Sequence, residues 1–319
     1  MLYTIKKSFA IHEIKRDKHI LYLEEYGNVD GIPILFLHGG PGSGCSDWQK
    51  SLFNDKIYRV IFLDQRGAGK SVPKRLLENN TILDLIGDIE YIRSYLKIDK
   101  WFLVGGSWGS TLAIAYAETK PSAILGMVLR SLFLGTKTEV DWAFRNGPIT
   151  FKPNLIKELN LILKNKINDN PIISLGKMLE SKNLKKVCIA AELWQEYEKN
   201  LSTIKPVKYD FKEILNKECD ELERLKKAPN TPFLENYYIK NNFFLKNNQL
   251  LNDKKLLYKI PISVIQGEYD LLCPPINSFL FSNNLPKVKI IKAHEAGHYI
   301  SDPGIKELMK KEIDELQYI

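Results

Sequence analysis

The 319-residue chain contains no uninterrupted run of 18 apolar residues, so none of its segments is expected to span a bilayer. Its first residues, Met1 to Lys7, also lack the apolar core of a secretory signal. The four cysteines lie far apart without a C-x-x-C pair, which argues against a zinc ribbon and against a disulfide framework. We therefore expect a cytoplasmic protein.

Long runs of like charge are missing as well. The chain has 46 Lys and Arg residues against 38 Asp and Glu residues, a formal net charge of +8, and no arginine-rich segment. Because acidic residues are interleaved with the basic ones, this surplus indicates a lysine-rich solvated surface, and we expect neither a nucleic-acid nor a membrane partner. With 44% hydrophobic and 26% charged residues, the composition is that of a globular chain and excludes disorder.

Short apolar runs alternate with helical patterns in the first 135 residues. An early strand is expected at 20–25, and buried strands are expected at 34–37, 58–63, 101–104 and 124–129. Thr81 and Asp84 form a capping box, which predicts a helix that continues to Leu96. Apolar strands joined by helices predict a mostly parallel sheet.

The pattern changes between residues 136 and 242, where lysine- and asparagine-rich helical segments are interrupted by prolines. The α/β alternation then returns, with strands expected at 262–266 and 288–291 and a closing helix at 302–317. We predict one α/β core formed by residues 1–135 and 243–319. Residues 136–242 are predicted to form an inserted helical cap.

A candidate nucleophile lies between a predicted strand and a predicted helix. The segment 105–109 reads Gly-Gly-Ser-Trp-Gly and matches G-x-S-x-G in the structural context that this motif requires. A tight turn there holds the Ser107 hydroxyl above the sheet, and the glycines leave room where Cβ atoms would collide. Ser107 is therefore the predicted nucleophile.

A serine hydroxyl needs a base and an acid that orients the base. The chain order expected for this motif is Ser, acid, His, and only His294 and His298 follow Ser107. His298 comes after the last predicted strand and is the predicted base, whereas His294 is expected to be structural. Asp270 follows the strand expected at 262–266 and is the predicted acid, with Glu268 as the alternative.

Two N–H donors are expected to stabilise an oxyanion in such a site. One is the backbone N–H of Trp108, directly after the nucleophile. The other is expected in the glycine-rich loop 38–42, where Gly40 is the first choice and Gly39 the second.

The segment 294–298, His-Glu-Ala-Gly-His, also fits the zinc-protease pattern H-E-x-x-H. That chemistry needs both histidines on one helical turn. Here the segment follows a predicted strand directly and contains Gly297, so we expect no metal site.

Three segments together resemble one known family: His-Gly-Gly-Pro-Gly at 38–42, Asp-Gln-Arg-Gly-Ala-Gly-Lys-Ser at 64–71 and Gly-Gly-Ser-Trp-Gly-Ser-Thr-Leu at 105–112. They are similar to the proline iminopeptidases, and the likeness extends from about residue 10 to the last helix. The resemblance implies an α/β-hydrolase fold with a helical cap and a serine peptidase without cofactor. It also implies release of N-terminal proline from peptides with a free amine, with Ser107, Asp270 and His298 at the triad positions.

Two cap segments carry the resemblance further. Residues 194–198 resemble the family's W-x-x-W-E segment, and residues 235–244 resemble its E-x-H-Y-F-x-N-x-x-F segment. The resemblance implies that Glu198 and Glu235 bind the substrate ammonium. It implies, more loosely, that Phe133 and Phe144 line the pocket for the proline ring.

The chain departs from the family pattern near the predicted acid, where Glu268 replaces the usual arginine. Tyr299 follows the predicted base where a small residue is common, and Ala68 stands where cysteine is frequent. These changes concern substrate preference more than the chemistry.

Two alternatives stay open at this point. A general esterase, amidase or lactonase acting on a small molecule would use the same core without paired acids. A non-catalytic binding protein on a decayed hydrolase scaffold is disfavoured by the complete Ser, Asp and His set. Epoxide hydrolases and dehalogenases of this fold use an Asp nucleophile, which Ser107 disfavours.

Overall fold

The computed structural model describes residues 1–205, 207–252 and 254–319. Its centre is an eight-stranded sheet with the order β1-β2-β4-β3-β5-β6-β7-β8. The strands are β1 Ala10–Arg16, β2 His19–Gly27, β3 Ile32–Leu37, β4 Tyr58–Asp64, β5 Trp101–Ser107, β6 Ile124–Leu132, β7 Ile262–Gly267 and β8 Val288–Ala293. The pairs β1–β2 and β2–β4 are antiparallel and all others are parallel, so the predicted mostly parallel sheet is confirmed.

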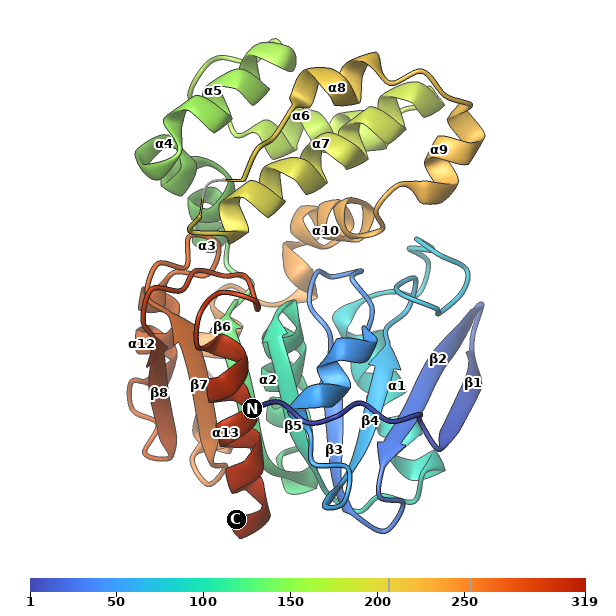
Figure 1. Ribbon diagram of the computed structural model, residues 1–319, viewed down its shortest axis with the longest axis vertical. Coiled ribbons are helices and arrows are strands. Elements are labelled where there is room, and N and C mark those ends of the chain that lie inside the picture. Colours follow the sequence, from blue (N-terminus) through green and yellow to red (C-terminus); the bar gives the residue numbers. More distant parts are fainter. Residues whose placement is uncertain (206, 253) are drawn as a thin grey trace.

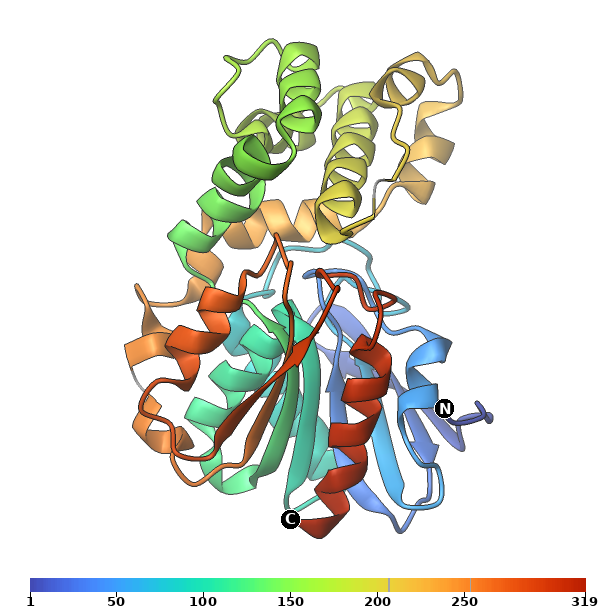
Figure 2. The same ribbon diagram turned by 60° about the vertical axis from the view of Figure 1, so that its left-hand side comes forward.

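Alternate side chains of each central strand enter two separate layers. Ile34 and Phe36 of β3 pack in one cluster with Ile313 of α13 (Ile305–Glu315), on one face of the sheet. Leu35 and Leu37 pack in the other cluster, which contains the apolar sides of α1 (Ile82–Tyr95) and α2 (Trp108–Thr119). Helices therefore cover both faces, as a buried parallel sheet requires (Figure 2).

Most of the remaining helices follow β6 and lie beyond the carboxyl ends of the strands (Figure 1). They are α3 Lys137–Asp141, α4 Gly147–Phe151, α5 Pro153–Ile162, α6 Pro171–Leu179, α7 Leu184–Ser202, α8 Phe211–Asn216, α9 Glu221–Lys227 and α10 Thr231–Lys240. Helix α10 runs between the sheet and the other helices of this group. The chain then returns through α11 Gln249–Asn252 to β7, and α12 Pro275–Ser282 joins β7 to β8. The boundaries of the cap at residues 136 and 242 stay a prediction.

The sequence patterns predicted the central elements and missed two peripheral ones. Helix α1 begins at the expected capping box, in which Thr81 Oγ1 accepts from the Asp84 N–H and the Thr81 N–H donates to Asp84. Strand β1 was not predicted because it is an edge strand in which only Ile14 is buried. Helix α12 was not predicted because its eight residues are too few for a clear helical period.

No helix within the described ranges is both long enough and apolar enough to cross a bilayer.

Candidate active site

Ser107 stands at the junction of β5 and α2, at the carboxyl edge of the sheet. Its backbone has φ 55° and ψ −125°, a strained conformation for a residue with a side chain. A Cβ atom at Gly105 would lie 2.7 Å from the carbonyl oxygen of Gly109, and one at Gly109 would overlap the Leu37 carbonyl. Both outer glycines of G-x-S-x-G are therefore required for β5, α2 and β3 to meet closely at this turn.

Asp270 and His298 come together from two loops at the same edge. The His298 Nδ1 atom lies 3.0 Å from Asp270 Oδ2 and 3.1 Å from Oδ1. The Asp270 side chain is fully buried and also accepts the backbone N–H groups of Leu272 and Cys273 at 3.1 and 2.8 Å. These donors fix the carboxylate, which in turn orients the imidazole. His298 and Ser107 line the same cleft.

The loop that follows β3 packs against the candidate nucleophile. A Cβ atom at Gly39 would lie 3.6 Å from the Ser107 Cβ, and Gly40 adopts φ 108°. Gly40 lines both cavities that meet at Ser107, whereas Gly39 lines only the larger one. Trp108 is the first residue of α2, so its backbone N–H has no partner within the helix. The residues selected for oxyanion donors thus surround Ser107.

A hydrogen-bonded chain that the sequence reasoning missed ties this loop to α2. The Gln65 backbone N–H donates to His38 Nε2 at 3.0 Å, and His38 Nδ1 donates to the Gly39 carbonyl at 2.8 Å. The Gln65 side chain donates to the His38 carbonyl at 3.0 Å and accepts from Trp108 Nε1 at 2.8 Å. Because Nε2 accepts a hydrogen bond, His38 is neutral, and burial lowers its pKa accordingly.

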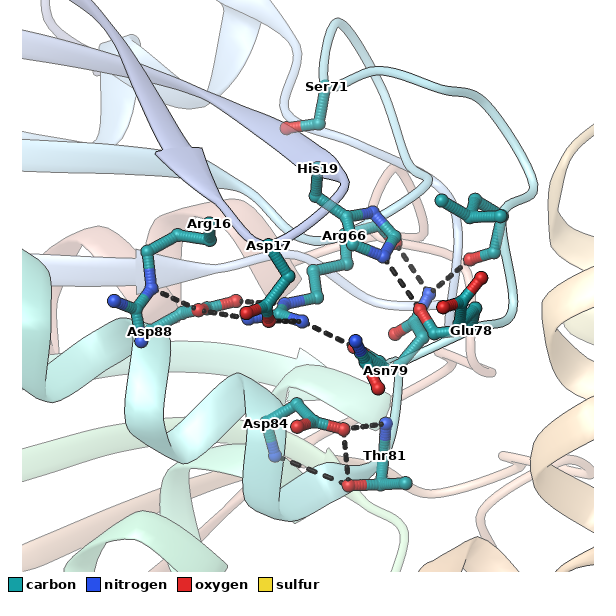
Figure 3. Close-up of polar contacts among 12 residues, drawn as sticks. Arg16, Asp17, His19, Arg66, Ser71, Glu78, Asn79, Thr81, Asp84 and Asp88 are labelled. Carbon is teal, nitrogen blue, oxygen red and sulfur yellow. Dashed lines mark hydrogen bonds and ion pairs between the residues drawn. The ribbon is translucent and has the colours of Figure 1, made fainter.

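Arg66, the residue after Gln65, is held in place by buried ion pairs (Figure 3). Its guanidinium forms a two-pronged ion pair with Asp88 of α1, at 2.5 and 2.6 Å, and contacts Asp17 at 2.9 Å. The Arg66 side chain is almost fully buried. In the sequence, only a family resemblance drew attention to the Asp-Gln-Arg-Gly segment. In the structure it places Gln65 between the loop 38–42 and Trp108.

Glu198 of α7 and Glu235 of α10 meet beside Ser107, in a cavity of about 40 Å³ that both line. Oε2 of each is buried and has no hydrogen-bond partner in the described part of the chain. Burial raises the pKa of both carboxyls, and the charge of Glu198 raises the pKa of Glu235 further. Two such groups in an apolar pocket attract a cation.

The walls of this small cavity are aromatic and aliphatic. Phe133 and Phe144 line it, together with Phe243, which contacts Phe133 edge to face at a centroid distance of 4.9 Å. Tyr197, which replaces the family's second tryptophan, is buried and donates its hydroxyl to the Phe144 carbonyl at 3.0 Å. Phe243 was not selected from the sequence because an apolar residue in a helical region gives no sign of its direction.

Comparison with known proteins agrees with this geometry. Residues 32–304 match the alpha/beta hydrolase fold family. The chain is 36% identical over 297 residues to a proline iminopeptidase of Arabidopsis thaliana, covering 91% of this chain and 74% of that protein. It is 34% identical over 319 residues to the proline iminopeptidase of Neisseria meningitidis, covering 99% of this chain and 98% of that protein. The chain belongs to the proline iminopeptidase family.

Solved structures of this fold are more distant in sequence. An alpha/beta fold hydrolase from Bacillus anthracis is 19% identical, with a TM-score of 0.62 over 97% of this chain and all of the other. This likeness concerns the fold alone. It places the iminopeptidase chain among hydrolases whose sheets have the same architecture.

The H-E-x-x-H segment of this proline iminopeptidase homologue does not lie on a helix. Residues 294–298 form a turn and irregular backbone after β8, so the helical turn that would bring the two histidines together is missing. His294 is 77% exposed and lies 3.3 Å from Glu268, whereas His298 faces Asp270. His294 is therefore a surface residue, and Glu268, the alternative acid, contacts His294, whereas Asp270 contacts His298. Glu196, two residues before Glu198 on α7, pairs instead with Lys199.

Proposed function

We propose that this chain is a serine exopeptidase that releases an N-terminal proline, or a similar small residue, from peptides with a free amine. The observation that carries the proposal is the meeting of two cavities at Ser107. The smaller one is lined by Glu198 and Glu235, with Phe133 and Phe144 in its apolar wall. The larger one is lined by His298 and borders the smaller one at Ser107 and Glu198, which line both. A peptide bond held at Ser107 then has its N-terminal residue in the small anionic pocket and its leaving chain in the larger cleft.

In the proposed reaction the Ser107 hydroxyl attacks the carbonyl carbon of the first residue while His298 accepts the hydroxyl proton. Asp270 keeps the imidazole in the orientation that presents Nε2 to Ser107. The backbone N–H groups of Trp108 and Gly40 stabilise the oxyanion. His298 returns the proton to the leaving amine, and water then hydrolyses the acyl-enzyme by the reverse sequence of proton transfers.

Glu198 and Glu235 restrict the enzyme to chain ends. A prolyl N-terminus is a secondary ammonium with two N–H donors, so each carboxylate can accept one of them. An internal peptide bond brings no positive charge, and the ionised carboxylates would face each other unneutralised. The small volume of this pocket, about 40 Å³, also leaves little room for a residue that precedes the first one.

The activity is expected to depend on pH through this pair. Burial raises the pKa of both carboxyls, and Glu198 raises that of Glu235. Below that pKa the pair retains a proton that must leave before an ammonium binds, so kcat/KM for prolyl-β-naphthylamide is expected to rise with pH through it. The same dependence is expected to be absent for 2-naphthyl acetate, which has no amine. Superimposable profiles between pH 4 and 9 for the two substrates would contradict this.

Gln65 is proposed as a positioning residue for the oxyanion site. Gln65→Met removes the bonds to the His38 carbonyl and to Trp108 Nε1. We expect kcat for prolyl-β-naphthylamide to fall by about tenfold or more with little change in KM, because the substrate pocket is untouched. Gln317→Met, at the far C-terminal end, is the matched control. Equal losses in both variants, or a loss confined to KM, would contradict this role.

A substrate panel tests the proposed function as a whole. Prolyl-, alanyl- and leucyl-β-naphthylamide are compared with N-acetylprolyl-β-naphthylamide at equal concentrations. We expect the prolyl compound to be cleaved fastest and N-acetylation to abolish its cleavage. Faster cleavage of the alanyl or leucyl compound, or indifference to acetylation, would favour a general esterase or amidase.

A cytoplasmic location is also proposed, supported by the four free cysteines.

A further inference from the structure

The larger cleft at Ser107 contains a cation that the proposed chemistry does not use. The cleft has a volume of about 530 Å³ and opens between the turn Asp47–Leu52, which includes Trp48, and the loop that carries His298. Arg130, near the end of β6, lines it beside Gly106 and Ser107.

The guanidinium of Arg130 lies directly against the residue before the candidate nucleophile. A Cβ atom at Gly106 would lie 2.9 Å from Arg130 Nη2 and 3.0 Å from Nε. Only glycine at position 106 therefore lets the cation approach the turn this closely. Nη1 donates to the His298 carbonyl at 2.6 Å and to Ser131 Oγ at 3.1 Å, which fixes the plane of the group.

The charge of Arg130 has no acidic partner in the ion pairs of the described residues. The two nearby acids that raise its pKa, Asp270 and Asp302, are engaged elsewhere. Asp270 holds His298, and Asp302 accepts the Gly297 N–H at 2.7 Å. Nε and Nη2 of Arg130 donate to none of the described residues, and neither is among the fully buried polar atoms without a partner. Both atoms therefore keep some exposed surface beside Gly106, which lines the cleft together with Arg130, and neither is used by another described residue.

We propose that Arg130 binds the free carboxylate of the leaving amino acid, so that dipeptides with an N-terminal proline are preferred substrates. The inference rests on the proposed function. In a dipeptide held at Ser107, the leaving nitrogen and one Cα separate the scissile carbonyl from the carboxylate. Consecutive residues are about 3.8 Å apart, so this carboxylate reaches the neighbourhood of Gly106. In a longer peptide the same position holds a neutral amide.

The physical chemistry of the site favours this anion. A guanidinium keeps its charge in proteins even where burial lowers its pKa, as it does here. Its planar fork matches a carboxylate, and a charge-assisted hydrogen bond in a partly dry cleft is stronger than one in water. Lys199 lies at the rim of the same cleft, but it is exposed and already paired with Glu196. It is the alternative cation.

The test compares prolyl-leucine with prolyl-leucine amide, which differ only in the charge of the last group. With wild-type enzyme we expect kcat/KM for the free acid to exceed that for the amide by about tenfold to a hundredfold. Prolyl-β-naphthylamide reports on the proposed function itself. If it is cleaved while acid and amide are equal, the inference on Arg130 is wrong and the function stands. If it is not cleaved, the proposed function is wrong, and the inference on Arg130 falls with it.

Variants assign the preference to a residue. Arg130→Met is expected to bring the acid-to-amide ratio close to one, and Arg130→Lys is expected to keep part of it. Because Arg130 also holds the His298 carbonyl, total activity is expected to fall, so the ratio is the decisive readout. A uniform loss with an unchanged ratio would make Arg130 a positioning residue only. An acid-to-amide ratio close to one in Lys199→Met would show that Lys199, and not Arg130, binds the carboxylate. Arg145→Met, on the exposed surface of the cap, is the matched control.

Discussion

Ser107→Ala is expected to lower kcat for prolyl-β-naphthylamide by about 10⁴-fold or more. The hydroxyl is the only group at the strained turn that can form the acyl-enzyme, and the oxyanion donors alone provide a small residual acceleration. Initial rates at saturating substrate measure this effect. The wild-type protein is also expected to gain the mass of one serine-directed phosphonate, and the variant none.

Two controls separate chemistry from folding in that experiment. Ser94→Ala changes an exposed serine of α1 and is expected to keep both activity and labelling. Circular dichroism is expected to be the same for both variants, since alanine also carries the Cβ that the turn accommodates. Activity within tenfold of wild type, or labelling of folded Ser107→Ala protein, would remove Ser107 from its proposed role. Failure to label the folded wild-type protein would revive the binding-protein alternative.

Replacing both cap glutamates, Glu198→Gln with Glu235→Gln, is expected to lower kcat/KM for prolyl-β-naphthylamide by about 10²- to 10³-fold. The amides keep the size of the pair and remove its charge, so the substrate ammonium would be buried without a counterion. Hydrolysis of 2-naphthyl acetate, which has no ammonium, is expected to stay within a few-fold of wild type.

The ester makes this result specific to recognition of the amine. A parallel loss on both substrates would indicate damage to Ser107 or His298 and contradict the proposed role. Glu196→Gln, two residues from Glu198 on the outer surface of α7, is the matched control and is expected to change neither rate. Unchanged cleavage of the prolyl compound by the double variant would favour the general esterase or amidase.

Local sequence patterns were sufficient for the elements that form the core. The apolar runs that became β3 to β7 are buried on both faces, and a buried strand needs a continuous apolar run that is visible in the sequence. The capping box at Thr81 is equally local. Strand β1 escaped prediction because it is an edge strand with one buried side chain, Ile14, and so has no continuous apolar run.

The sequence predicted some residues of the candidate site and gave no indication of others. Ser107 belongs to a motif whose geometry is confined to five residues, and chain order then left few choices for Asp270 and His298. Glu198 and Glu235 are ordinary glutamates on two helices, and only a family resemblance singled them out. Gln65 and Arg130 carry no local sign at all, since their partners His38, Trp108 and His298 come from other segments.

By itself, the sequence determined the class of fold, the nucleophile and the absence of long apolar or cysteine-paired segments, because these depend on short-range pattern and composition. The tertiary structure alone decided that Glu198 and Glu235 line one small cavity beside Ser107 and that Arg130 lines the larger cleft. Those properties depend on distances between elements remote in the chain. A buried charge acquires its meaning from the groups packed around it, and that packing exists only in the folded protein.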